Sequence, residues 1–395
     1  MSRNVVAISL ERLYSTVNLA LTAHGLNREA AACISSVVTD AERDGCTSHG
    51  LFRVPGFLHA LDTGAVDGPG ASLASLAPTS PAEGVVVVDG GGCSFAAPAF
   101  AAGRPELVRR ARANGVACLV LQRVRHFSAL WWEVEALAGD DRLLALAAVN
   151  SAAFVAHAPG GAAKVYGTNP LAFGCPRGEG LPPLVFDQAS STISRGDMQL
   201  AMAAGRRLPG GAAIFEGTET RDPVKALARR GAQLPFGGHK GTNVALMVEL
   251  LAGVATNSPL AVEAAEELEG MALTALDAEA GGLPPGGAPT VNGELIIAVD
   301  PTVLFGGGGG GGGDGGSGGS GGGAWTSEAF TDRVEVLLRA VQASAADPSD
   351  EGALRLPSDR RYAQRLKTLE RGGEVDLDAK LFSDIESAAA LGKRK

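Results

Sequence analysis

Residues 84–121 read GVVVVDGGGCSFAAPAFAAGRPELVRRARANGVACLVL, and this stretch decides the fold class. The valines at positions 85–88 predict a strand with a glycine-rich exit, and residues 116–121 predict a second, buried strand. The segment between them, residues 98–114, has the pattern of a helix. A helix between two strands is typical of α/β proteins, so the stretch predicts this class.

The rest of the chain continues the alternation of strands and helices. Residues 7–62 are predicted to be largely helical, because leucine and valine recur every three or four positions from Leu10 to Leu21. Asp222 and Pro223 mark another helix start, as N-cap and first helical residue. The remaining predicted elements are strands at 143–149 and 294–300, and helices at 28–44, 223–230, 241–255, 327–342 and 376–391.

The composition argues against nucleic-acid and membrane partners. The chain has 395 residues, 45% of them hydrophobic, which is enough for two domains with a buried core. Its formal net charge of −9 and the lack of a basic stripe argue against nucleic acid. No run of about 18 apolar residues predicts a membrane span. The charged first residues do not resemble a secretory signal, so we expect a cytoplasmic protein.

The cysteines and glycines predict no special site. The five cysteines are widely spaced and form no CxxC pair, so we expect neither a disulfide framework nor a zinc site, and no other metal site is predicted. Residues 306–323 are almost entirely glycine, and no Lys-Ser/Thr pair follows them. We interpret them as a disordered insertion and not as a phosphate-binding loop.

The run DGCTSHGLFR at 44–53 places a hydroxyl, an imidazole and a guanidinium close together. If the helix predicted at 28–44 continues, His49 and Arg53 lie one turn apart on the same face. Arginine binds a carboxylate with two parallel hydrogen bonds, and histidine exchanges protons near neutral pH. On these residues alone, a helix end with a capping Ser48 and surface charges remains the alternative.

Five further segments carry polar side chains beside predicted strands or helix starts. Glycines, hydroxyls and helix starts suit phosphate groups, but each segment also has a plain reading as an aromatic cluster, a turn or a helix cap. A GxGxxG sequence in the right context is absent, so we do not expect a Rossmann fold. The segments are RHFSALWW at 125–132, YGTNPLAFG at 166–174, FDQASST at 186–192 with SRGD at 194–197, PFGGHKG at 235–241, and LPSDRRY at 356–362.

Taken together and in this order, the segments resemble the malate/L-lactate dehydrogenase-like oxidoreductases, a non-Rossmann NAD(P)-dependent family. The resemblance covers nearly the whole chain except residues 306–323. It implies a family-specific α/β fold with helical N- and C-terminal parts, a homodimer, and an active site in a cleft between domains. The implied domains are a helical substrate domain from 1–122 and 324–395, and an NADP-binding α/β domain from 123–305.

The resemblance also implies a role for each matching residue. His49 is the expected proton donor, assisted by Ser48 and Asp197, and Arg53 is expected to hold the substrate carboxylate. The expected substrate contacts also include Thr168, Arg195 and Gly196. The expected cofactor-binding residues are His126, Phe127, Ser128, Ala129, Leu130, Asp187, Gln188, Ala189, Ser190, Ser191, His239, Lys240, Ser358, Asp359, Arg360, Arg361, Tyr362, Ala363 and Gln364.

Asp197 favours the cyclic-imine reductases of this family, because many relatives that act on hydroxy acids carry lysine there. The expected reaction is therefore reduction of a cyclic ketimine acid by NADPH, with Arg360, Arg361 and His239 available for the 2′-phosphate. Two alternatives stay open: a 2-hydroxy acid dehydrogenase of the malate, lactate or ureidoglycolate kind, and a catalytically silent dimeric nucleotide-binding protein. The resemblance is weaker at Arg125, Trp132 and Gln188, where the family pattern is expected to carry other residues.

Overall fold

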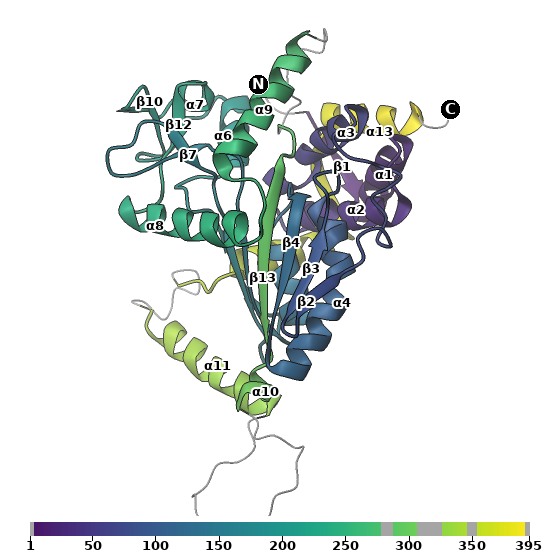
Figure 1. Ribbon diagram of the computed structural model, residues 1–395, viewed down its shortest axis with the longest axis vertical. Coiled ribbons are helices and arrows are strands. Elements are labelled where there is room, and N and C mark those ends of the chain that lie inside the picture. Colours follow the sequence, from purple (N-terminus) through teal and green to yellow (C-terminus); the bar gives the residue numbers. More distant parts are fainter. Residues whose placement is uncertain (1–3, 278–286, 306–325, 346–353, 392–395) are drawn as a thin grey trace, which may run out of the picture.

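A seven-stranded sheet forms the centre of the computed structural model, which describes residues 4–277, 287–305, 326–345 and 354–391 (Figure 1). The strand order is β2-β3-β4-β13-β5-β8-β9. Only β3 and β4 are parallel, and all other neighbours are antiparallel. The strands are β2 (Thr79–Ala82), β3 (Val85–Asp89), β4 (Val116–Arg125), β5 (Leu144–Val149), β8 (Leu171–Cys175), β9 (Leu184–Gln188) and β13 (Val291–Val299).

The parallel pair is joined by α4 (Ala96–Asn114), so the predicted strand–helix–strand unit is confirmed. Phe100 and Leu107 of α4 are fully buried in the core that also contains Leu119 of β4. Gly103 permits this close approach, because a Cβ there would lie 2.6 Å from the Leu119 side chain. Strand β13 then inserts antiparallel between β4 and β5, which the alternation of elements along the sequence does not reveal.

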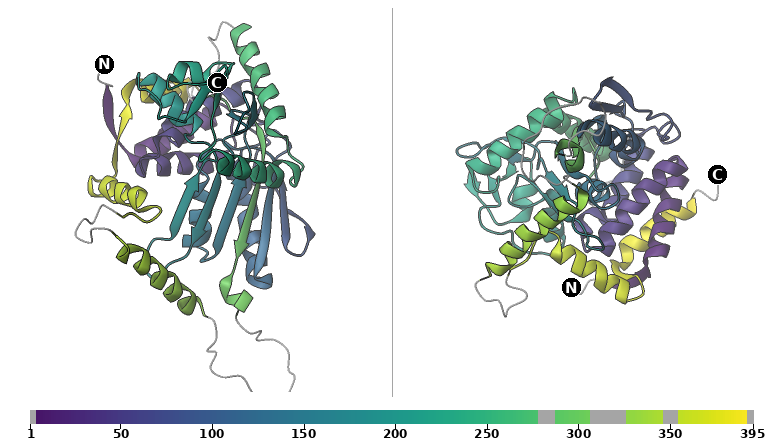
Figure 2. Two further views of the ribbon diagram at one scale, coloured as in Figure 1. Left: turned by 90° about the vertical axis from the view of Figure 1, so that its left-hand side faces the viewer. Right: turned by 90° about the horizontal axis from the view of Figure 1, so that it is seen from below.

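The helical part combines both ends of the chain. Strand β1 (Val5–Ser9) pairs antiparallel with β14 (Glu374–Asp378), and α13 (Ala379–Leu391) packs against α1 (Leu10–Ala23) (Figures 1 and 2). The expected helices at 7–62 and 376–391 were wrong where these two strands lie. In β14 the buried Val375 and Leu377 alternate with exposed acids, which is a strand period. The other N-terminal helices are α2 (Arg28–Arg43) and α3 (Val54–Asp62).

A second, smaller sheet has the order β11-β10-β12-β6-β7. It lies across the molecule from α1 and α13 (Figure 1). The predicted helix at 223–230 begins at Asp222 and Pro223 as expected but ends at Leu227, because Ala228 is extended. The predicted helix at 241–255 begins earlier and finishes as a π-helical turn. These elements are β6 (Val155–Ala156), β7 (Lys164–Tyr166), β10 (Ala213–Phe215), β11 (Thr218–Glu219), β12 (Gly231–Gln233), α6 (Arg195–Ala203), α7 (Pro223–Leu227), α8 (His239–Val248) and η3 (Glu249–Val254).

The remaining helices lie on the periphery or beside the cavity. The helix predicted at 327–342 is confirmed, and the glycine-rich residues 306–323 lie outside the described residues. No helix among the described residues has the length and apolarity that a membrane crossing needs. The remaining helices are α5 (Trp131–Gly139), α9 (Ala261–Asp277), α10 (Pro301–Phe305), α11 (Ser327–Ala343) and α12 (Asp359–Glu370).

The expected division into two domains stays a prediction. Its boundary between residues 122 and 123 falls inside β4, and strands from both sides of the boundary share the seven-stranded sheet. The α1–α3 helices form their own hydrophobic core with α13, which also includes Phe95 from the start of α4.

We expect Leu119→Ala to lower the free energy of unfolding by about 2–5 kcal/mol, because it leaves a cavity between α4 and the sheet. The matched control is Leu19→Ala on α1, whose side chain is half-exposed and whose loss should change stability by no more than about 0.5 kcal/mol. Urea denaturation measures both. Equal losses for the two variants would contradict the assigned core.

Candidate active site

A cavity of about 2110 Å³ collects most of the predicted site residues. Five of them do not line it, since Ala129 and Ser190 are buried behind its wall, Tyr362 faces Pro183, and His239 and Lys240 are exposed at the start of α8. The predicted residues that line it are Ser48, His49, Arg53, His126, Phe127, Ser128, Leu130, Thr168, Asp187, Gln188, Ala189, Ser191, Arg195, Gly196, Asp197, Ser358, Asp359, Arg360, Arg361, Ala363 and Gln364.

Two short 3-10 turns, and not a continued helix, carry the central residues. Helix α2 ends at Arg43, and η1 (Thr47–His49) is separated from η2 (Leu51–Arg53) by Gly50, whose φ of −90° and ψ of −136° are neither helical nor extended. The expected one-turn spacing of His49 and Arg53 was therefore wrong. The turn still brings them together, because the Arg53 Nε donates a 2.8 Å hydrogen bond to the carbonyl of Ser48.

Glu42 at the end of α2 stabilises this turn. Its carboxylate accepts a 2.7 Å hydrogen bond from the backbone N–H of Leu51 and lies so close to Gly50 that a Cβ there would collide with it. Burial raises the pKa of Glu42 to about 7. The sequence offered no sign of this contact, since Glu42 belongs to the helix and Leu51 to the turn that follows.

His49 is neutral at physiological pH in this environment. Its Nδ1 lies 3.2 Å from the Ser48 hydroxyl, which leaves the other ring nitrogen for a ligand. Burial, together with the charge of Arg53, lowers the pKa of His49 to about 3. Burial also lowers the pKa of Arg53 to about 10, with Asp197 opposing it, so Arg53 remains a cation. Its guanidinium lies 4.6 Å from the centre of the Phe127 ring.

The start of α6 faces this cationic group. Ser194 caps the helix by accepting a 3.0 Å hydrogen bond from the Asp197 N–H. Gly196 is required for the contact, because a Cβ there would lie 2.9 Å from Arg53 Nη2. Arg195 lies 3.9 Å from the Phe154 ring centre, and burial beside Arg53 lowers its pKa to about 10.

Asp197 is exposed in the cavity and acts on Arg53 through its charge. Among the described residues, its carboxylate makes no hydrogen bond to Ser48 or His49. The expected relay of Ser48, His49 and Asp197 therefore stays a prediction.

Thr168 lines the cavity and is hydrogen-bonded to residues of two neighbouring loops. Its N–H donates a 3.1 Å hydrogen bond to the Ser151 hydroxyl, and its carbonyl accepts from Ser190. Ser151 and the buried Asn150 also line the cavity, and the sequence analysis missed both. Their position directly after the strand predicted at 143–149 is the signal that would have found them.

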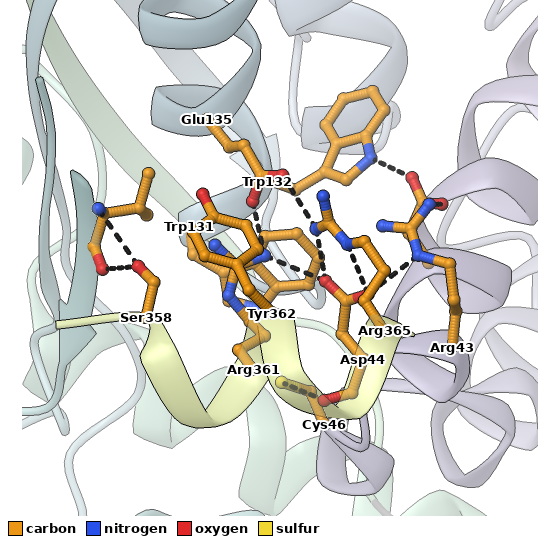
Figure 3. A network of polar contacts seen from close by, with 12 residues as sticks. Arg43, Asp44, Cys46, Trp131, Trp132, Glu135, Ser358, Arg361, Tyr362 and Arg365 are labelled. Carbon is orange, nitrogen blue, oxygen red and sulfur yellow. Dashed lines mark hydrogen bonds and ion pairs between the residues drawn. The ribbon is translucent and has the colours of Figure 1, made fainter. Parts of the chain in front are cut away.

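The start of α12 is fixed by a buried ionic network (Figure 3). The Asp44 carboxylate, which has no exposed side-chain surface, pairs with Arg43, Arg361 and Arg365. Both α12 arginines also pair with Glu135 of α5. Burial opposes ionisation of Asp44, but the hydrogen bonds and charges of Arg365 and Arg43 outweigh it and lower its pKa below the ordinary value.

This network separates two arginines that the sequence analysis treated alike. Arg361 is held by two carboxylates and stacks 4.1 Å from the centre of the Trp131 ring. Arg360 is exposed, lines the cavity and has no ion pair among the described residues. No side chain caps the start of α12. Arg360 and this helix start are therefore suited to hold a phosphate group.

Of the three residues expected to depart from the family pattern, Arg125 and Trp132 make structural contacts. Arg125 pairs with Glu267 at 2.8 Å, and the Trp132 indole donates a 2.9 Å hydrogen bond to Asp40 (Figure 3). Gln188 is exposed at the end of β9.

We expect the neutral His49 to make stability depend on pH. The folded-state pKa is about 3 and the ordinary value is 6.5, so the unfolded chain gains a proton that the folded chain does not. The stabilisation of the folded state that results from this pKa difference is complete above pH 6.5 and is lost as the pH falls toward 3. Below pH 6.5 the free energy of unfolding of the wild type should fall with pH more steeply than that of His49→Gln, by up to about 1.4 kcal/mol per pH unit. Urea unfolding at a series of pH values measures this difference. Parallel pH profiles would contradict the neutral, buried histidine.

The chain matches known proteins over almost its full length. The family model described as malate/L-lactate dehydrogenase matches residues 8–308. The chain is 36% identical over 373 residues to the Δ1-pyrroline-2-carboxylate/Δ1-piperideine-2-carboxylate reductase of Pseudomonas putida, covering 94% of each chain. It is 38% identical over 381 residues to the Δ1-pyrroline-2-carboxylate reductase of Pseudomonas fluorescens, covering 96% of this chain and 98% of that one.

Solved structures agree with this assignment. The Δ1-piperideine-2-carboxylate reductase from Pseudomonas syringae has a TM-score of 0.78 at 33% identity, covering 97% of this chain and 99% of that chain. Malate dehydrogenase from Entamoeba histolytica, at 18% identity, has a TM-score of 0.80 over 99% of both chains and shares the fold. The chain therefore belongs to the malate/L-lactate dehydrogenase family of NAD(P)-dependent oxidoreductases.

Proposed function

We propose that the chain uses NADPH to reduce the C=N bond of cyclic ketimine acids, forming L-pipecolate from Δ1-piperideine-2-carboxylate and L-proline from Δ1-pyrroline-2-carboxylate. The observation that carries this proposal is the half-buried Arg53 guanidinium beside the neutral Ser48–His49 pair in one cavity. The relatives named as reductases of these two imines support the choice of substrate.

Arg53 is suited to hold the substrate carboxylate. Its Nε is already fixed on the Ser48 carbonyl, so the position of the guanidinium is set before a ligand binds. A buried guanidinium binds a carboxylate more strongly than an exposed one, because less water competes. Arg195 adds a second positive charge close by. A substrate held here has its C=N bond near His49.

His49 then supplies a proton to the ring nitrogen while C2 receives a hydride. NADPH, when bound, provides that hydride. In the ligand-free site burial and the charge of Arg53 keep His49 deprotonated. A substrate carboxylate on Arg53 offsets this charge, so substrate binding raises the pKa of His49 toward the range in which it can carry the proton. The hydride at C2 and the proton at nitrogen together complete the amine.

The residues of the cavity fit the cofactor at the start of α12. The exposed Arg360 and the uncapped helix start offer a positive charge and backbone N–H groups to a phosphate. The buried Arg361 positions this helix through Asp44 and Glu135. The preference for NADPH over NADH rests on Arg360 being available for the 2′-phosphate.

The test of the proposal is an assay of cofactor oxidation over a substrate panel. The panel contains the two cyclic ketimines, pyruvate and oxaloacetate, each with NADPH and with NADH. We expect turnover of the ketimines with NADPH. Turnover of the keto acids alone would replace the proposal with a 2-hydroxy acid dehydrogenase, and tight NADPH binding without turnover would indicate a silent binding protein. Equal efficiency with both cofactors would defeat the NADPH preference.

We expect His49→Gln to lower kcat on Δ1-piperideine-2-carboxylate about 100- to 10,000-fold, the usual contribution of a general acid. The KM for NADPH should change little. The control is His24→Gln at the end of α1, whose histidine pairs with Asp62 far from the cavity. Near-wild-type turnover by His49→Gln would refute the proton-donor role.

We expect Arg53→Lys mainly to weaken substrate binding, because lysine lacks the planar guanidinium that forms two parallel hydrogen bonds to a carboxylate. One lost hydrogen bond to a charged group corresponds to about 1.5–3 kcal/mol, or a loss of about 10- to 150-fold in kcat/KM, chiefly through KM. Arg12→Lys, on the exposed face of α1, is the matched control. An unchanged KM for the ketimine would show that the carboxylate binds elsewhere.

A further inference from the structure

Three buried side chains that the proposed reaction does not use meet in the wall of the cavity. His126 follows β4, Glu133 lies on α5, and Glu294 lies on β13. The His126 Nε2 is 3.8 Å from the Glu133 carboxylate and 3.9 Å from the Glu294 carboxylate. One ligand atom from each lies within 4.8 Å of the others.

The Glu133 and Glu294 carboxyl groups interact with each other at hydrogen-bond range. Beyond this mutual contact, His126 Nε2, Glu133 Oε2 and both Glu294 oxygens have no hydrogen-bond partner among the described residues. The side chains are 6%, 1% and 0% exposed, respectively, so water does not reach most of these atoms. Leaving a buried polar group unpaired costs about 1–3 kcal/mol, and more for a charge. Several such atoms at one point indicate a ligand between them.

Burial favours the neutral forms of both carboxyl groups. It raises the pKa of Glu133 to about 8, and the charge of Asp187 acts in the same direction. Burial and the charge of Glu133 raise the pKa of Glu294 well above its ordinary value, and His126 acts in the opposite direction. Burial lowers the pKa of His126, so the imidazole is neutral. The two carboxylates therefore require either protons or a cation.

We propose that His126, Glu133 and Glu294 bind one divalent transition-metal ion, Zn²⁺ or Mn²⁺. Separations of 3.8 and 3.9 Å are too long for hydrogen bonds. They are short enough for the three groups to share one ion, with metal–ligand bonds of about 2.0–2.2 Å. An imidazole with two carboxylates is a nitrogen and oxygen set that suits zinc or manganese, whereas calcium and magnesium prefer oxygen alone.

The location explains how an ion would reach the cluster and what it would stabilise. His126 lines the cavity, which provides access for the ion. In the sheet, Glu294 lies between Leu121 of β4 and Val149 of β5. An ion bound here would cross-link α5, β13 and the segment of residues 126–130 that follows β4. The expectation of no metal site was drawn from the cysteines, and this set contains none.

The test adds Zn²⁺ or Mn²⁺ alone to the full chain after dialysis against a chelator. Desalting and elemental analysis give the metal bound per chain, and thermal unfolding gives Tm. We expect about one ion per chain and a higher Tm, since an ion that binds only the folded state stabilises it. Glu294→Gln should lose both effects. Asp62→Asn, which removes the acid of the surface His24–Asp62 pair, should retain them.

Two further measurements do not depend on the variant folding well. Co²⁺ added to the wild type should give a visible absorption spectrum of a nitrogen- and oxygen-bound ion, removed by adding Zn²⁺. Apparent affinity should rise with pH, with release of protons into a weakly buffered solution, because both carboxyls must be deprotonated to bind.

The proposal is overturned if the wild type binds no metal in stoichiometric amount, or if Glu294→Gln binds as much as the wild type. It is equally overturned if Glu294→Gln raises Tm while metal leaves the Tm of the wild type unchanged. That result would mean that Glu133 and Glu294 share a proton instead. None of these measurements needs substrate or NADPH, so failure here leaves the proposed reductase activity standing.

Discussion

The buried Asp44 carboxylate connects the two halves of the site. It accepts from Arg43 at the end of α2 and from Arg361 and Arg365 on α12, two segments far apart in the sequence. Removing one partner of a buried ion pair costs about 3–5 kcal/mol, because the remaining charge stays buried. Because Asp44 lies directly before the η1 turn, it fixes α12, which carries the proposed cofactor contacts, against the turn that carries Ser48 and His49.

Two half-buried cations, Arg53 and Arg195, lie close together in the cavity. Burial and the charge of Arg53 lower the pKa of Arg195 and keep His49 neutral. The proposed substrate brings a negative charge to this part of the cavity. A small carboxylic acid supplies that charge, so the same binding event anchors the ligand and changes the proton affinity of His49. Recognition and proton transfer are thereby coupled through a single charge.

A structural feature could be predicted from the sequence when it depends only on residues that are close together in the chain. The strand–helix–strand unit around α4 was predictable, because its hydrophobic period is visible within a short window. The candidate site was found through ordered motifs, and the cavity brings most of those residues together. The bend at Gly50 was missed because a backbone conformation set by Glu42 is a tertiary effect. The meeting of Glu133 with Glu294 depends on β13 entering the middle of the sheet, which no local pattern encodes.

The pairing of β1 with β14 has a consequence for how the chain is made. The helical core includes Leu13 and Val17 near one end and Phe382 and Ile385 near the other. The ion pair between Arg12 and Glu386 spans 374 positions. At a synthesis rate of about 5–20 residues per second, the first helices wait roughly 20–70 seconds for their partners. During that interval α2 and α3 can already pack on α1, but the part of α1 that contacts α13 stays uncovered until the end of the chain is made.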